Sequence, residues 1–178
     1  MVILLCVLII IAIPFIIALF SAREYTIIRT ILINRAQQAV FDYSKLLRNG
    51  ELYNKWIMTD PAIKKTFTGT DGTVGFIYAW ESENKQVGKG EQEITQIIES
   101  EKISSEVRFI KPFTGKAQTY METSPFAENQ THLTWVFMGE LNYMMRVIHM
   151  LLNLKKALTK DIDTSLEQLK NNLETNDN

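Results

Sequence analysis

Three pairs of glutamates lie two residues apart in the middle of the chain: Glu81 with Glu83, Glu91 with Glu93, and Glu99 with Glu101. On a β-strand this spacing places both carboxylates of a pair on the same face. A carboxylate enclosed in a protein interior has a raised pKa and can serve as a general acid or base. Here the face that carries the pairs is the one opposite Tyr78, Trp80 and Ile94, so the pattern favours pairs on a solvated outer face.

Other side chains with catalytic or ligand chemistry are scarce. The chain has one cysteine, Cys6, and two histidines, His132 and His149, which is too few for a zinc site of ordinary composition. No Gly-x-Ser-x-Gly motif is present. The glycines of residues 69–75 and 88–90 lie just before or at the beginning of expected strands, not at a helix N-terminus, and are typical of turns and bulges. We therefore predict no metal, no cofactor and no catalytic residue set.

The N-terminal segment has a different character. Met1 to Phe20 contain no charged side chain, and a helix of about 20 apolar residues matches the roughly 30 Å hydrocarbon thickness of a bilayer. The segment is too long for a cleaved signal peptide and has no basic residue before it. We predict a transmembrane anchor at residues 1–21, with Val2–Phe20 in the membrane, and a single-pass membrane localisation. The side on which the rest of the chain lies stays open.

The remainder has the composition of one domain. All 19 lysines and arginines and all 20 aspartates and glutamates lie there, and the net charge of the chain is -1. Interspersed charges of both signs leave no basic surface for nucleic acid, so a nucleic-acid partner is excluded. We assign residues 24–172 to the domain and residues 173–178 to a disordered tail. Nothing in the composition fixes an oligomeric state.

Periodicity predicts the elements. Alternating apolar residues indicate antiparallel strands at residues 25–35, 63–68, 75–83, 87–99, 102–113, 118–127 and 131–141. Helical spacing indicates two short helices between the first two strands and one long helix over residues 143–173. Short turns between successive strands predict a meander. The large rings of the strands share one face, which the long helix is expected to cover.

This order of elements resembles the SRPBCC superfamily (START-like, polyketide cyclase/dehydrase type), in particular its membrane-anchored bacterial members of unassigned function. The resemblance lies in Tyr25–Asn34 leading into Val40–Tyr43, in Tyr53–Trp56, and in the turns at residues 69–80 and 88–90. It implies an α+β helix-grip fold, with a curved antiparallel sheet wrapped on a long C-terminal helix. Relatives hold lipids, sterols or polyketide intermediates between sheet and helix, and they share no common catalytic residue set.

Together, the fold and the anchor predict a membrane-tethered protein that binds a hydrophobic small molecule, lipid or isoprenoid-like. The residues expected to line its cavity are Trp56, Phe76, Tyr78, Trp80, Val107, Phe109, Tyr120, Trp135, Phe137, Met145 and Ile148. One alternative is a cyclase- or hydrolase-like enzyme that uses a cavity carboxylate or tyrosine. Another is a non-catalytic stress-response interaction domain whose core is filled, with no cavity as large as roughly 300 Å³. The absence of transferable catalytic residues favours a binding protein over an enzyme.

Overall fold

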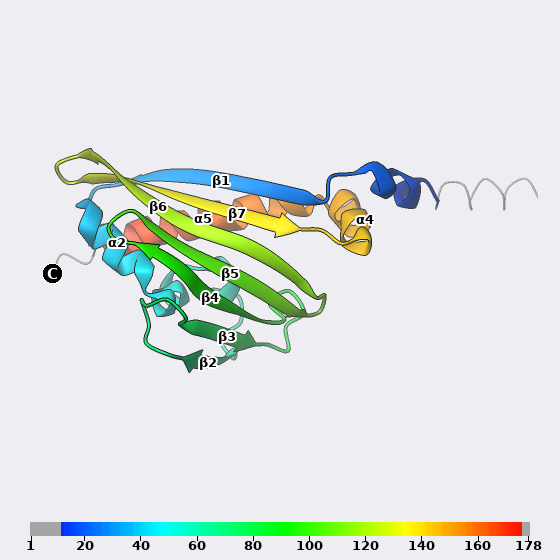
Figure 1. Ribbon diagram of the computed structural model, residues 1–178, viewed down its shortest axis with the longest axis horizontal. Helices are drawn as coiled ribbons and strands as arrows, with labels where there is room; N and C mark the ends of the chain where they lie inside the picture. The colour runs from blue at the N-terminus through cyan, green and yellow to red at the C-terminus, as the bar shows by residue number, and fades with distance from the viewer. Residues whose placement is uncertain (1–11, 176–178) are drawn as a thin grey trace, which may run out of the picture.

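Residues 12–175, the part of the chain that the computed structural model describes, are organised by a seven-stranded antiparallel sheet. Its strands are β1 (Glu24–Ile33), β2 (Lys64–Thr68), β3 (Ile77–Glu81), β4 (Lys89–Ile98), β5 (Lys102–Lys111), β6 (Gly115–Ala127) and β7 (Gln130–Glu140). The order across the sheet is β1-β7-β6-β5-β4-β3-β2 (Figure 1). Strands β2 to β7 therefore form the expected meander, and β1 joins it beside β7.

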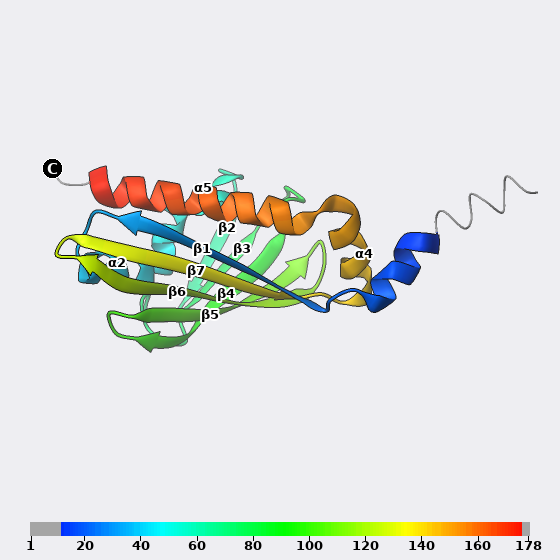
Figure 2. The ribbon, with the colours of Figure 1, turned by 90° about the horizontal axis from the view of Figure 1, so that it is seen from above.

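Helices cover one face of this sheet. They are α2 (Gln37–Lys45), the 3-10 helix η1 (Leu47–Leu52), α3 (Lys55–Met58), α4 (Tyr143–Leu152) and α5 (Leu154–Thr175). Figure 2 shows α5 running along the sheet, with α4 and the helical residues 12–20 at one end. The seven-stranded antiparallel sheet with a long C-terminal helix confirms the predicted helix-grip architecture.

The predicted membrane localisation is contradicted. Within residues 12–175 no helix is both long enough and apolar enough to cross a bilayer. Residues 1–11, which include most of the expected membrane segment, lie outside the described residues. The single-pass assignment depended on a spanning helix, and the described chain contains none.

Alternation along the strands places the large rings as expected. Phe76 and Tyr78 are buried, as are Leu133, Trp135 and Phe137 of β7. Ile98 is an exception: strict alternation along β4 would place it on the inner face with Ile94, but it is 41% exposed. The register of β4 against β5 shifts between Ile94 and Gln96, and a bulge of this kind turns the following side chains to the other face.

The C-terminal helix is not continuous, which corrects the prediction of one helix over residues 143–173. Asn153 has φ 48° and ψ 47°, a left-handed conformation, and it separates α4 from α5. Its backbone N–H donates to the carbonyl of His149, which closes α4. At the other end α5 continues to Thr175, so residues 173–175 of the expected tail are helical, and residues 176–178 lie outside the described part.

Helix α5 is fixed to the sheet and to α3 by both apolar and polar contacts. Ile162, Leu166 and Leu169 are buried against the sheet. The hydroxyl of Ser165, itself fully buried, accepts a hydrogen bond of 2.9 Å from the backbone N–H of Lys55 at the start of α3. Arg29 of β1 forms an ion pair with Asp163. These contacts hold α3 and α5 as two walls above the inner face of the sheet.

Candidate functional site

A cavity of about 720 Å³ lies between the inner face of the sheet, α3 and the first half of α5. Pockets that enclose small molecules range over roughly 300–1,000 Å³, so this volume suits one ligand of moderate size. Strands β3 to β7 supply one wall, and Trp56, Leu158 and Asp161 belong to the helical wall. The cavity contradicts the alternative of a filled core.

Most of the predicted pocket residues line this cavity. Those that do are Trp56, Tyr78, Trp80, Val107, Phe109, Trp135, Phe137 and Met145, and Tyr120 borders the cavity without turning its ring into it. Phe76 is fully buried in the core without lining the cavity, and Ile148 also lies outside the lining. Tyr120 is in the outward register of β6, and its ring lies 3.7 Å from the Lys102 ammonium, so the ring belongs to the outer face. The sequence alone could not show which of the adjacent residues Tyr120 and Met121 faces inward, because both side chains are large and largely apolar.

Aromatic rings form the centre of the apolar wall. Trp56 of α3 meets Trp135 edge-on at 6.4 Å between ring centroids, and lies 6.2 Å from Phe137. The indole N–H of Trp135 donates to the hydroxyl of Thr119 at 2.8 Å. Thr119 in turn donates to the carbonyl of Val136. The Trp135 indole N–H and the Thr119 hydroxyl therefore both have partners within the protein, and the aromatic wall presents only apolar ring faces to the cavity.

Three tyrosines line the cavity as neutral phenols. Burial raises the pKa of Tyr25 to about 12. Burial also raises the pKa of Tyr53, and burial together with the nearby Glu51 charge raises that of Tyr78, whose hydroxyl donates to Glu51 at 3.4 Å. A phenol with a raised pKa donates hydrogen bonds at neutral pH and is a poor general base.

Tyr25 was not among the predicted site residues, although alternation along β1 places it on the inner face with Ile27. Its ring packs over Gly139 of β7, where an added Cβ would lie 2.3 Å from the Tyr25 ring. The ring of His149 lies 4.9 Å from that of Tyr25, and burial lowers the pKa of this histidine. These side chains form the end of the cavity nearest α4.

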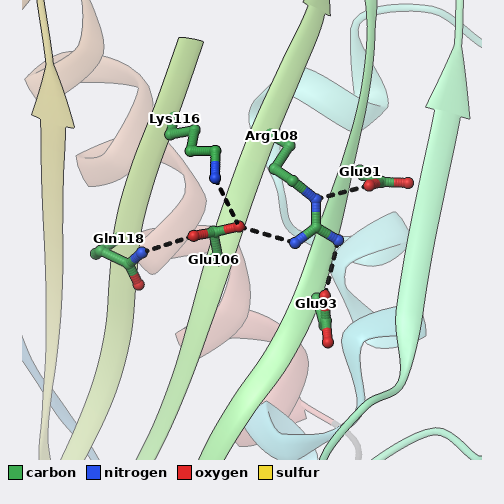
Figure 3. A network of polar contacts seen from close by, with 6 residues as sticks. All are labelled: Glu91, Glu93, Glu106, Arg108, Lys116 and Gln118. Carbon is green, nitrogen blue, oxygen red and sulfur yellow. Dashed lines mark hydrogen bonds and ion pairs between the residues drawn. The ribbon is translucent and has the colours of Figure 1, made fainter.

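The paired glutamates lie outside the cavity. Glu91 and Glu93 of β4 both bind the guanidinium of Arg108, which also binds Glu106, on the outer face of the sheet (Figure 3). Among the described lining residues the carboxylates are Glu140 and Asp161. The outward placement of the pairs agrees with the interpretation favoured by the sequence.

Metal chemistry has no support in residues 12–175. No group of three or more His, Cys, Asp or Glu side chains lies close enough there to hold an ion. His132 and His149 come from different ends of the molecule, on β7 and α4. Cys6 lies outside the described residues.

The sequence matches no known family model and no curated protein. Solved structures do resemble the fold. Norcoclaurine synthase from Thalictrum flavum, in complex with dopamine and hydroxybenzaldehyde, superposes with a TM-score of 0.64 at 9% identity, covering 92% of this chain and 94% of that one. Ara h 8.0201 superposes with a TM-score of 0.59 at 10% identity, covering 86% and 99%.

A Mesorhizobium loti protein superposes with a TM-score of 0.62 at 15% identity, covering 86% of this chain and 100% of that one. The seven-stranded antiparallel sheet with its long C-terminal helix is consistent with the helix-grip Bet v1 fold. This agrees with the fold implied by the sequence resemblance. The START-like, polyketide cyclase type remains a prediction, since identities this low report on the fold alone.

Proposed function

We propose that this protein binds a hydrophobic small molecule, lipid or isoprenoid-like in character, in the cavity between its sheet and α5. The observation that carries the proposal is the cavity itself, about 720 Å³ and lined by Trp56, Trp135 and Phe137. Burying a ligand's apolar surface against these rings contributes about 25 cal/mol per Å². A structure of the same fold holds dopamine and hydroxybenzaldehyde, which are small aromatic molecules.

The charged side chains support this assignment by their position. The charged residues of the described lining are Lys55, Lys111, Lys116, Glu140 and Asp161. All except Asp161 are exposed, and none belongs to the aromatic centre of the wall. A highly charged ligand would have to lose its hydration there without a paired charge, at a large free-energy cost.

Two adjacent serines of β5 provide a matched test. Ser105 lines the cavity and is 2% exposed, whereas Ser104 points to the outer face. We expect Ser105→Phe to place a ring in the cavity and weaken binding of the neutral fluorescent probe N-phenyl-1-naphthylamine at least tenfold. We expect Ser104→Phe to leave the affinity within about twofold. Fluorescence titration measures both, and circular dichroism verifies folding.

Native mass spectrometry of the full chain, purified without detergent, supplies an independent measurement. We expect a bound small molecule, or uptake of one from a panel of neutral lipids and isoprenoid alcohols. If the wild-type protein takes up neither the probe nor any panel member, the proposed function is wrong. Equal probe affinities for the Ser105→Phe and wild-type proteins would place binding elsewhere.

A further inference from the structure

The apolar inner face of the sheet carries a short line of polar side chains. Gln92 of β4 lies opposite Val107, and Ser105 of β5 lies opposite Thr119. Gln92 and Ser105 are thus diagonal neighbours on one face of adjacent antiparallel strands, a spacing that long side chains span. All three polar residues line the cavity. The line crosses β4, β5 and β6 beneath the helical wall.

The members of this line differ in their hydrogen bonding. Thr119 is satisfied, because it accepts from Trp135 and donates to the carbonyl of Val136. Within residues 12–175 the side chains of Gln92 and Ser105 have no hydrogen-bond partner. Ser105 is nevertheless 2% exposed. The Ser105 hydroxyl is not among the described polar atoms that are buried without a partner, so it is open to the cavity, where a ligand oxygen can pair with it.

The neighbouring groups do not supply that partner. Tyr78 lies directly opposite Gln92 in the register of β3 and β4, but its hydroxyl is already bound to Glu51. Ile94 and Val107, the other strand neighbours of Ser105 and Gln92, are apolar. The carboxamide of Gln92 and the hydroxyl of Ser105 therefore lie on neighbouring strands and face the cavity, and each can both donate and accept a hydrogen bond there.

We propose that Gln92 and Ser105 form a polar subsite that binds one uncharged oxygen of the ligand, a hydroxyl or a carbonyl. This inference rests on the proposed function and specifies the class of ligand: a largely apolar molecule with a single neutral oxygen positioned against β4 and β5. A carboxamide and a hydroxyl can each donate and accept, which suits a hydroxyl or a carbonyl oxygen. Neither carries the charge that would compensate the burial of a carboxylate or phosphate.

The test compares two probes of nearly equal shape, 2-naphthol and 2-methylnaphthalene, which differ by a hydroxyl in place of a methyl group. The measured quantity is the ratio of their two dissociation constants for each variant at pH 7, by fluorescence titration. One hydrogen bond changes an equilibrium by about 2- to 12-fold. We expect Gln92→Leu and Ser105→Ala each to shift the ratio by that factor toward 2-methylnaphthalene, because only 2-naphthol loses a partner.

Matched controls come from the same two strands. Gln96 and Ser104 point away from the cavity, so Gln96→Leu and Ser104→Ala are expected to leave the ratio unchanged. A third probe, 2-naphthoate, is expected to bind wild-type protein more weakly than 2-naphthol. Melting temperatures verify that the variants fold. Ser105→Ala removes a single oxygen and keeps the test available if Gln92→Leu does not fold.

The outcomes separate the two proposals. If wild-type protein binds both neutral probes but neither cavity-side variant changes their ratio, the polar subsite is wrong and the proposed function stands. A preference of the wild-type protein for 2-naphthoate also overturns the neutral subsite. If wild-type protein binds none of the probes or the lipid panel, the proposed function fails and the subsite fails with it.

Discussion

Arg108 holds the outer face of the sheet together through a single guanidinium. Its Nε donates to Glu91 at 2.6 Å, and its two terminal nitrogens donate to Glu93 and Glu106, each at 2.8 Å (Figure 3). Glu106 also accepts from Gln118 of β6 at 3.1 Å. Hydrogen bonding to Arg108 lowers the pKa of Glu106, and the three carboxylates raise the pKa of Arg108. The group therefore links β4, β5 and β6 on the face opposite the cavity.

We expect Arg108→Leu to lower the free energy of unfolding at pH 7 by on the order of 1 kcal/mol, because three neighbouring carboxylates lose their shared cation. A carboxylate whose pKa is lowered by folding stabilises the protein above its unfolded pKa, and that contribution disappears as pH falls through the lower folded pKa. The difference between wild-type and variant should therefore shrink as pH falls from 7 toward about 3. Urea unfolding at several pH values measures it.

The exposed Arg23, which is outside this group, provides the control. Arg23→Leu is expected to change stability by less than about 0.5 kcal/mol at every pH. A wild-type-to-Arg108→Leu difference that stays constant down to pH 3 would contradict the assigned role of the ion pairs.

Single residues show how far sequence reasoning reaches. Alternation alone places Glu91 and Glu93 on the outer face, since each is flanked by inward-facing positions such as Gln92 and Ile94. It does not identify Arg108 as their partner, because pairing depends on the register between strands. Tyr120 was assigned inward because nothing in an isolated strand distinguishes two adjacent apolar residues. Alternation with Ile103 and Val107 places Ser105 on the inner face, but a small polar side chain gives no indication that it lines a pocket.

At the scale of elements, the break at Asn153 is the main feature that periodicity does not reveal. Apolar residues continue at helical spacing from α4 into α5, so the pattern predicts one helix. The conformation of a single residue interrupts it, and asparagine is among the few non-glycine residues that adopt left-handed backbone angles at low cost. The break allows α4, with Met145 and His149, to close one end of the cavity while α5 follows the sheet.

Two substitutions at Asn153 test this element. Asn153→Gly is expected to keep the stability within about 0.5 kcal/mol, because glycine adopts φ 48° without a Cβ penalty. Asn153→Ala is expected to lose about 1 kcal/mol, because alanine in the left-handed region is strained. Thermal unfolding of the two variants measures the difference at one position. Equal melting temperatures would mean that the turn does not constrain the chain.

At the scale of the whole molecule, the sequence predicts the arrangement of strands and helices better than the volume of the cavity between them. The order of β2 to β7 follows from short turns and alternation, whereas the pairing of β1 with β7 does not. The long amphipathic C-terminal segment has one place to bury its apolar stripe. The volume between the layers depends on how α3 and α5 are spaced. That spacing is set by contacts such as Lys55 to Ser165 and Trp56 to Trp135, between segments far apart in sequence. Such distances are not encoded in any local pattern.

The tyrosines enclosed between sheet and helices make the whole fold sensitive to alkali. Burial raises the pKa of Tyr25 to about 12, from 10.0, and also raises the pKa values of Tyr53 and Tyr78. A phenol whose pKa is raised by folding stabilises the protein fully below its unfolded pKa, and this stabilisation is lost as pH rises from 10 toward 12. We therefore expect the free energy of unfolding to fall over that range.

Replacing one phenol isolates its share of this effect. Tyr25→Phe removes the titrating hydroxyl and keeps the ring that packs over Gly139. Between pH 9 and 11 the free energy of unfolding of the Tyr25→Phe protein should fall by about 1 kcal/mol less than that of wild-type protein. The difference arises because the Tyr25 phenol ionises more readily in the unfolded chain than in the folded one. Tyr120→Phe, on the outer face beside Lys102, is the matched control and should follow the wild-type curve. Urea unfolding across this pH range, with phenolate absorbance followed in parallel, measures all three proteins. Superimposable profiles for wild-type and Tyr25→Phe would show that the Tyr25 hydroxyl is not enclosed between β1, β7 and α4.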